Sequence, residues 1–275
     1  MALALDRTIH FFNYKNISLH YTLYGVGSKP IFLFHGFGLS GKIFFELEEV
    51  FSSQYTIYNF DLPFHGQSHW QGEAPITEIF WKNFLEEFCR QKNIEKFSLL
   101  GYSIGCRLLW ASVNSCPAKI EEVIAIAPDG IKSSFWYRLA TSSAVSRFLF
   151  KTTLFKNYIP AILTIGKFLH LAPKITVRFA ESQLMTAEQR ERVYYTWINF
   201  RELKVHEIKT SAMINLYKIK VSIYLGEQDK IITAKTIEPL VQKLENKNVI
   251  TLQAGHSNLV GKLVEYLRSD LNKRS

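Results

Sequence analysis

Short apolar runs recur along the chain, separated by stretches whose apolar residues follow helical spacing. Continuous runs of this kind predict strands that are covered on both faces. Before them, residues 17–24 alternate apolar and polar positions and predict an exposed strand that Gly25 and Gly27 close. The continuous runs lie at residues 31–34, 55–60, 97–100, 123–127, 221–225 and 249–252.

Helical patterns fall between these runs, at residues 42–51, 79–91, 104–115, 234–244 and 257–271. Strands that alternate with helices predict an α/β fold with a mostly parallel central sheet and helices on both faces. Residues 131–208 break the rhythm, because they contain helix-like stretches and no convincing strand. We therefore expect a core of residues 1–130 and 209–275, interrupted by a helical cap at 131–208.

The composition is that of an ordinary globular protein. The 275 residues are 47% hydrophobic and 21% charged, which excludes disorder and allows a large core. Met1–Leu5 shows neither a basic leader nor a long apolar stretch, so no secretory signal is expected. Cys89, Cys106 and Cys116 have no metal-ligand spacing and no disulfide framework, which predicts a reducing, cytoplasmic location.

The net charge of +9 is concentrated in one segment. Basic proteins often bind nucleic acid, but no RNP, helix-turn-helix or zinc pattern is present, so we expect no nucleic-acid partner. Three interpretations of the basic segment stay open: a solvated face, a site for an anionic substrate such as an acyl-CoA, and peripheral contact with an anionic membrane. Between residues 131 and 180 there is no Asp or Glu, and the bases are Lys132, Arg138, Arg147, Lys151, Lys156, Lys167, Lys174 and Arg178.

Aromatic residues accompany these bases. They suit either an acyl pocket or packing within the cap, and the pattern does not separate the two. They are Phe135, Trp136, Tyr137, Phe148, Phe150, Phe155 and Phe168.

The pentapeptide Gly101-Tyr102-Ser103-Ile104-Gly105 fits G-x-S-x-G between a predicted strand and a predicted helix. A serine on such a tight turn has its hydroxyl exposed as a candidate nucleophile, and the glycines keep the crowded turn free of Cβ atoms. Its hydroxyl needs a base to remove the proton, and the base needs a carboxylate to orient it. Cys106, one helical turn further, is expected to pack beneath the turn.

His256 and Asp229 are the candidate base and acid, because each follows a predicted strand near its carboxyl end. Asp129 also follows a strand, at residues 123–127, and stays open as the alternative acid. The remaining histidines carry no comparable signal, and His35 is expected to form structural hydrogen bonds.

Five separated motifs in this order resemble the α/β-hydrolase-fold superfamily over nearly the whole chain. Its members keep the chain order Ser, Asp, His. The resemblance implies an oxyanion hole made by the backbone N–H groups of Phe37 and Ile104. One position departs from the family pattern, since Phe64 stands where glycine is usual. The motifs are His35-Gly36-Phe37-Gly38, the pentapeptide around Ser103, Leu225-Gly226-Glu227-Gln228-Asp229, Ala254-Gly255-His256, and Asp61-Leu62-Pro63-Phe64-His65-Gly66-Gln67-Ser68.

These observations predict a serine hydrolase that cleaves a carboxylic ester or related small acyl substrate, apolar or anionic, through a covalent acyl-enzyme. Ser103 would attack, His256 would transfer the proton and Asp229 would orient the imidazole. No metal and no organic cofactor is expected, and the sequence sets no oligomeric state. The alternatives are a carbon–carbon bond hydrolase or haloperoxidase-like perhydrolase with the same triad, and a non-catalytic hydrolase-fold receptor or interaction protein.

Overall fold

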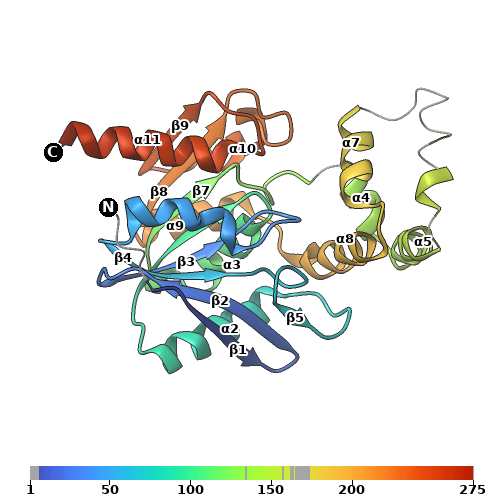
Figure 1. Ribbon diagram of the computed structural model, residues 1–275, viewed down its shortest axis with the longest axis horizontal. Coiled ribbons are helices and arrows are strands. Elements are labelled where there is room, and N and C mark those ends of the chain that lie inside the picture. The colour runs from blue at the N-terminus through green and yellow to red at the C-terminus, as the bar shows by residue number, and fades with distance from the viewer. Residues whose placement is uncertain (1–5, 134, 157, 162–163, 165–173, 275) are drawn as a thin grey trace. The chain divides into compact units, whose positions relative to one another are not determined.

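A computed structural model describes residues 6–133, 135–156, 158–161, 164 and 174–274 (Figure 1). The chain forms two compact units. The first comprises Met1–Gln71, Ile76–Lys132 and Leu203–Ser275, and the second comprises Gly72–Pro75 and Ser133–Glu202. Lys167 of the basic segment and Phe168 of the aromatic set lie outside the described residues.

The first unit is built on one sheet, which in the described residues has nine strands in the order β1-β2-β4-β3-β6-β7-β8-β9, with β5 paired to β2. Strands β4, β3, β6, β7, β8 and β9 run parallel to one another, whereas β1 and β5 pair antiparallel to β2, and β2 pairs antiparallel to β4. The bounds are Thr8–Tyr14 (β1), Ile17–Tyr24 (β2), Lys29–Phe34 (β3), Tyr55–Phe60 (β4), His69–Trp70 (β5), Phe97–Tyr102 (β6), Ile120–Ile126 (β7), Lys220–Gly226 (β8) and Lys247–Leu252 (β9).

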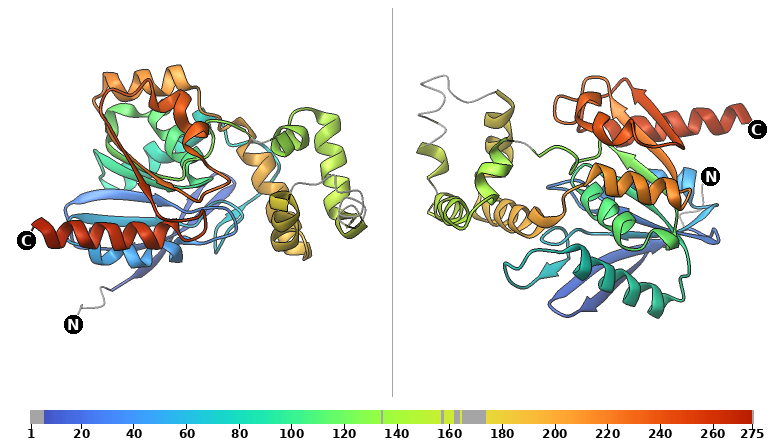
Figure 2. Two further views of the ribbon diagram at one scale, coloured as in Figure 1. Left: turned by 90° about the horizontal axis from the view of Figure 1, so that it is seen from above. Right: turned by 180° about the vertical axis from the view of Figure 1, so that it is seen from behind.

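Helices cover both faces of this sheet, and the right view of Figure 2 shows it from the side opposite to that of Figure 1. The predicted α/β architecture is thereby confirmed. One layer consists of α2 (Glu78–Lys92), α3 (Gly105–Ser115), α9 (Glu207–Leu216) and α10 (Ala234–Val241). The other consists of the 3₁₀ helix η1 (Gly41–Leu47), α1 (Glu48–Phe51) and α11 (Leu259–Arg274), and η2 (Pro117–Lys119) leads into β7.

Aromatic side chains fill the space between α2 and the sheet. Thr77 begins α2 by accepting a hydrogen bond from the Phe80 amide, and the helix then buries Trp81, Phe84 and Phe88 at helical spacing. Phe88 contacts Phe32 of β3 edge to face, with ring centroids 5.4 Å apart. Each such buried ring stabilises the fold by about 1.5–3 kcal/mol, so this layer holds the central strands in register.

Three local expectations were wrong. Residues 17–24 were predicted to be an exposed strand, but β2 is buried, because Phe88 of α2 packs on Tyr21 and the loop after β4 covers His20 through Asp61. Residues 249–252 were predicted to be covered on both faces, but β9 is an edge strand and Val249 is 40% exposed. Residues 42–51 were predicted as one helix, whereas the segment begins as η1 and only its last four residues, Glu48–Phe51, are α-helical.

The second unit is helical, and none of its described residues forms a strand. Its elements are α4 (Phe135–Thr141), α5 (Ala144–Phe155), α7 (Lys174–Gln183), α8 (Ala187–Asn199) and the 3₁₀ helix η3 (Phe200–Glu202). Phe150 of α5 stacks on Trp197 of α8 at 5.4 Å, and Tyr137 of α4 meets the same indole at 5.3 Å. Trp197 therefore joins three helices of this unit. Across the described part of the chain, no helix combines the length and apolar character needed to cross a bilayer.

Candidate active site

Ser103 lies on the turn between β6 and α3, and its backbone adopts a left-handed φ of 52°. This conformation is unfavourable for a residue with a side chain, and hydrogen bonds on both sides hold it. The Ser103 amide donates to the Ile126 carbonyl at 2.9 Å, and the Cys106 amide donates to the Ser103 carbonyl at 3.0 Å. A Cβ on Gly105 would lie 2.1 Å from the Phe34 carbonyl oxygen, so only glycine lets α3 start this close to β3.

His256 meets the Ser103 hydroxyl from the loop after β9. Its Nε2 lies 3.0 Å from Ser103 Oγ, although the two residues are 153 positions apart in the chain. The Tyr102 hydroxyl donates a 2.5 Å hydrogen bond to the His256 carbonyl, and this contact ties the loop to the end of β6. Tyr102 was not among the predicted site residues, because its position in the pentapeptide admits any residue.

Asp229 completes the chain of hydrogen bonds, with Oδ2 2.7 Å from His256 Nδ1. Its Oδ1 accepts from the amides of Ile231 at 2.7 Å and Ile232 at 2.9 Å. Burial raises the pKa of this carboxyl, but the hydrogen bond and charge of His256, together with the two amides, outweigh burial and hold the pKa below its usual value. The carboxyl is therefore ionised at neutral pH and faces the imidazole.

Asp129, the alternative acid, faces a different partner. Its Oδ2 accepts from Arg107 Nε at 2.7 Å, and its amide donates to the Ser103 carbonyl at 3.2 Å. Arg107 lies on α3 and is only 3% exposed. The sequence contained one indication of this pair: Arg107 is a single basic residue within an apolar helix start, Cys106-Arg107-Leu108-Leu109-Trp110, and a buried base needs an acidic partner. The geometry thus brings Ser103, His256 and Asp229 together and places Asp129 with Arg107.

The loop His35–Gly38 follows β3 and contains the predicted oxyanion donor Phe37. His35 is fully buried; its Nδ1 donates to the Gly36 carbonyl at 2.7 Å, and its Nε2 accepts from the Leu62 amide at 3.0 Å. Burial lowers the pKa of His35 to about 4, against the opposing effects of the Gly36 hydrogen bond and the Asp61 charge. His35 is therefore a neutral link between the loops after β3 and β4.

The second predicted donor, Ile104, lies at the N-cap of α3, where backbone N–H groups have no acceptor within the helix. Phe37 contacts His65 edge to face at 5.3 Å. The roles of the two amides stay predictions that rest on the family resemblance.

Asp61 organises the loop after β4. Its Oδ2 lies 2.8 Å from His20 Nδ1 and accepts from the Gln67 amide at 3.0 Å, while its Oδ1 accepts from the Gly41 amide at 2.8 Å. Phe64, which replaces the family's usual glycine, has a φ of 66°. The departure therefore leaves a backbone conformation that glycine favours, and the Asp61 hydrogen bonds hold the loop around it.

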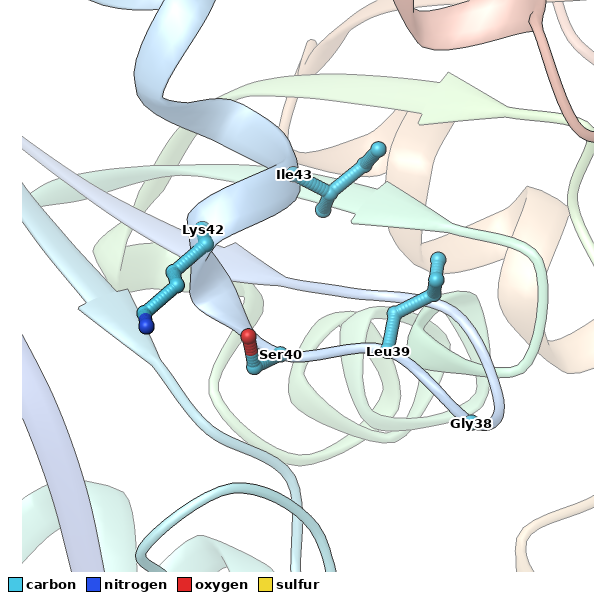
Figure 3. A pocket seen from close by; sticks show the side chains of 5 residues that line it. All are labelled: Gly38, Leu39, Ser40, Lys42 and Ile43. Carbon is cyan, nitrogen blue, oxygen red and sulfur yellow. The ribbon is translucent and has the colours of Figure 1, made fainter.

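An open hollow of about 460 Å³ lies beside the His35–Gly38 loop (Figure 3). Gly38, Leu39, Ser40, Lys42 and Ile43 line it, and Lys42 supplies a cation. Among the residues that the structure describes, no three His, Cys, Asp or Glu side chains gather as metal ligands would.

The chain matches the sequence model of the alpha/beta hydrolase fold family over residues 29–263 and belongs to that family. It is 28% identical over 110 residues to a pimeloyl-[acyl-carrier protein] methyl ester esterase of Aliivibrio salmonicida, covering 40% of each protein. It is 29% identical over 104 residues to an (E)-2-((N-methylformamido)methylene)succinate hydrolase of Acinetobacter baylyi, covering 37% of each. The matches thus span about two fifths of the length of these curated relatives.

Solved structures resemble the whole fold. Carboxylesterase CesB from Bacillus subtilis superposes with a TM-score of 0.64 at 15% identity, covering 98% of this chain and 91% of that one. A thermophilic esterase from Thermogutta terrifontis gives a TM-score of 0.67 at 15% identity, covering 98% of both chains. The predicted superfamily is confirmed, and the chain belongs to a family of hydrolytic enzymes.

Proposed function

We propose that this protein is a serine hydrolase that cleaves a carboxylic ester or related acyl substrate through a covalent acyl-enzyme. The observation that carries the proposal is the continuous hydrogen-bond chain from Ser103 Oγ through His256 to Asp229, with links of 3.0 and 2.7 Å. A hydroxyl, an imidazole and a buried carboxylate in this order form the arrangement that acyl transfer requires.

In the proposed reaction, His256 donates its Nδ1–H to Asp229, so the lone pair on Nε2 is free to accept the Ser103 hydroxyl proton. Ser103 Oγ then attacks the substrate carbonyl carbon. His256 returns the proton to the leaving alcohol, and the acyl group remains on Ser103. A water molecule, deprotonated by the same imidazole, releases the acid and restores the serine. The proposed steps need only these side chains and water.

The amides of Phe37 and Ile104 are proposed to bind the developing oxyanion. They belong to the loop after β3 and the start of α3, two elements that meet at Gly105 and the Phe34 carbonyl. Loss of one such donor typically costs about 2.7–4 kcal/mol of transition-state stabilisation. A displacement of the turn at Ser103 would therefore reduce the rate even if Ser103, His256 and Asp229 kept their hydrogen bonds.

The names of the relatives favour an ester among the acyl substrates. One relative is named for a methyl ester on a carrier-bound acyl chain, and another for a substituted succinate, so both an extended and a small anionic substrate belong in the test. We also propose that residues 131–208 act as a cap, since this segment follows β7, whose last residue Ile126 accepts a hydrogen bond from the Ser103 amide. Three buried free cysteines suit the predicted cytoplasmic setting.

A fluorophosphonate probe tests the proposal directly. We expect the wild-type protein to become labelled at Ser103, Ser103→Ala to lose the label, and the matched surface variant Ser269→Ala to label normally. A panel of esters with varied acyl length, including methyl esters, CoA thioesters and dicarboxylate half-esters, then defines the substrate class. If the folded wild type neither labels nor hydrolyses any ester, the proposal is wrong and a binding role replaces it.

A further inference from the structure

The helical hairpin α4–α5 in the second unit exposes an unusual amount of apolar surface. On α5, exposed side chains occur at positions i, i+3 and i+4, and Phe148 is 67% exposed. On α4 they occur at i, i+1 and i+4, and Phe135 is 61% exposed. Scattered apolar side chains are normal on a surface, but a run along two consecutive helices marks an interaction site. The six residues are Phe135, Trp136, Leu139, Val145, Phe148 and Leu149.

These exposed residues are not needed to hold the hairpin together. Both helices bury a separate set of side chains, with Tyr137 and Leu154 only 5% and 1% exposed. Tyr137 and Phe150 contact Trp197 of α8, and a capping box between Ser143 and Ser146 begins α5. The hairpin therefore has two apolar faces, one buried within its own unit and one presented to solvent.

The charged side chains of the hairpin are all basic. Neither α4 nor α5 contains an acidic residue, and Arg138 and Lys156 are exposed without an ion-pair partner among the described residues. Lys151 differs, because it pairs with Glu73, a member of the same unit. Arg147 donates from Nη1 to the Thr141 carbonyl at 3.2 Å and so links the two helices. The solvent-facing side of the hairpin combines bulky apolar groups with uncompensated positive charge.

We propose that the α4–α5 hairpin docks this protein onto an anionic membrane surface. The helices would lie in the plane of the interface, with the six apolar side chains inserted about 5–10 Å into the boundary between head groups and acyl chains. Arg138 and Lys156 would remain at the level of the anionic head groups. This proposal goes beyond hydrolysis, because it concerns where the protein binds and not what Ser103 attacks.

The chemistry of the surface favours lipid over a folded acidic partner. A folded acidic protein would need an apolar groove of complementary shape beside its acidic groups to take up the exposed Phe and Leu side chains. A bilayer interface accepts both: its anionic head groups attract the bases, and its acyl region takes up the apolar groups without needing a complementary shape. The mixed composition of the hairpin therefore points to lipid.

Vesicle sedimentation with the full chain tests the proposal. We expect the wild type to bind vesicles of phosphatidylcholine with phosphatidylglycerol, to bind pure phosphatidylcholine at least about tenfold more weakly, and to lose affinity as salt rises. The double variant Phe148→Ser/Leu149→Ser should bind the anionic vesicles about tenfold or more weakly. Arg138→Gln/Lys156→Gln should lower affinity similarly and flatten the salt dependence.

Matched controls separate the hairpin from general surface effects. Ile208→Ser removes a comparably exposed side chain from α9, and Lys96→Gln/Lys235→Gln removes two bases elsewhere; both should bind vesicles like the wild type. Ser103→Ala should also bind normally, so failure of the hydrolase proposal would leave this result unchanged. Absence of vesicle binding by the wild type, or unchanged binding by the hairpin variants, overturns the proposal. Capture of an acidic acyl-carrier protein in place of vesicles does so too.

Discussion

Asp129 and Asp229 follow neighbouring parallel strands, β7 and β8, yet they bond to different side chains. Asp229 bonds to the imidazole of His256, and Asp129 bonds to the guanidinium of Arg107, each at 2.7 Å. The first pair can take part in proton transfer, because a neutral imidazole can accept a proton at one ring nitrogen; the second cannot, because guanidinium has no free acceptor and stays protonated. The partner, and not the strand end, therefore decides what each carboxylate can do.

The pairs also serve the same serine in different ways. Asp229 reaches the Ser103 hydroxyl through His256, whereas Asp129 reaches the Ser103 backbone, since its amide donates to the Ser103 carbonyl. One acid is placed to influence the reactivity of the side chain, and the other to hold the strained turn. Changing each acid in turn tests which of the two carboxylates serves the imidazole.

The largest effect is expected from Asp229→Asn, which should lower kcat about 10⁴-fold by removing the charge that orients and stabilises the imidazole. Asp129→Asn is the matched control and should keep kcat within about tenfold of the wild type. Ester hydrolysis under saturating substrate measures both. If Asp129→Asn abolishes turnover while Asp229→Asn does not, the assignment of the acid is reversed.

Asp129→Asn should instead act on stability. It leaves the buried Arg107 without a counter-charge, and breaking such a pair typically costs about 3–5 kcal/mol of unfolding free energy; we expect the lower end, because Asp129 is partly exposed. Urea unfolding of Asp129→Asn, Arg107→Met and the double variant measures the coupling. Additive single-variant losses would contradict a direct interaction.

Unfolding free energy measured as a function of pH extends the comparison to two histidines, because His35 is fully buried whereas the side chain of His256 is 19% exposed. Unfolded His35 takes up a proton near pH 6.5, but the folded side chain stays neutral until its pKa of about 4. Its contribution to stability is thus intact above pH 6.5 and is lost as pH falls toward 4, by about 3 kcal/mol.

The unfolding free energy of the wild type minus that of His35→Gln should therefore shrink across this window. His206→Gln, at an exposed histidine, provides the control and should track the wild type at every pH. A difference between wild type and His35→Gln that is constant with pH would refute the assignment of His35 as a neutral link.

The smallest effect is expected from Tyr102→Phe, which removes the hydrogen bond to the His256 carbonyl. A single neutral hydrogen bond contributes about 1 kcal/mol, so unfolding free energy should fall by that amount and kcat/KM by less than tenfold. Tyr217→Phe, at a half-exposed tyrosine after α9, should change neither quantity. An unaltered Tyr102→Phe protein would show that the His256 loop is held by other contacts.

Local patterns predicted the strands and the Ser103 turn because the information lies in adjacent residues. The runs at 55–60 and 97–100 are mostly apolar, and Gly105 stands where α3 approaches β3. The partner of Asp129 could not be predicted, because Arg107 lies on a helix 22 positions away and a local pattern does not reveal a contact over that separation. For the same reason the sequence left Asp129 and Asp229 as alternatives.

Other features depend on neighbours that the sequence does not identify. Whether residues 17–24 are exposed depends on the side chains that pack on them, such as Phe88 of α2 against Tyr21, and these lie far away in the sequence. The conformation of Phe64 follows from the loop that Asp61 organises, not from the preference of phenylalanine. The exposed face of α4 and α5 was not predicted either, since their aromatic residues suited an acyl pocket or packing within the cap, and both interpretations bury them.

The hydrogen bond between His256 and Ser103 also has a consequence for the order of events during synthesis and refolding. It spans 153 positions, and the strands that carry its two ends lie in different parts of the sheet, with β7 and β8 between them. The ribosome must therefore release the chain as far as His256 before the two side chains can meet. Such distant pairings form late and slowly, so regain of probe labelling after dilution from urea will report completion of the sheet from β6 to β9.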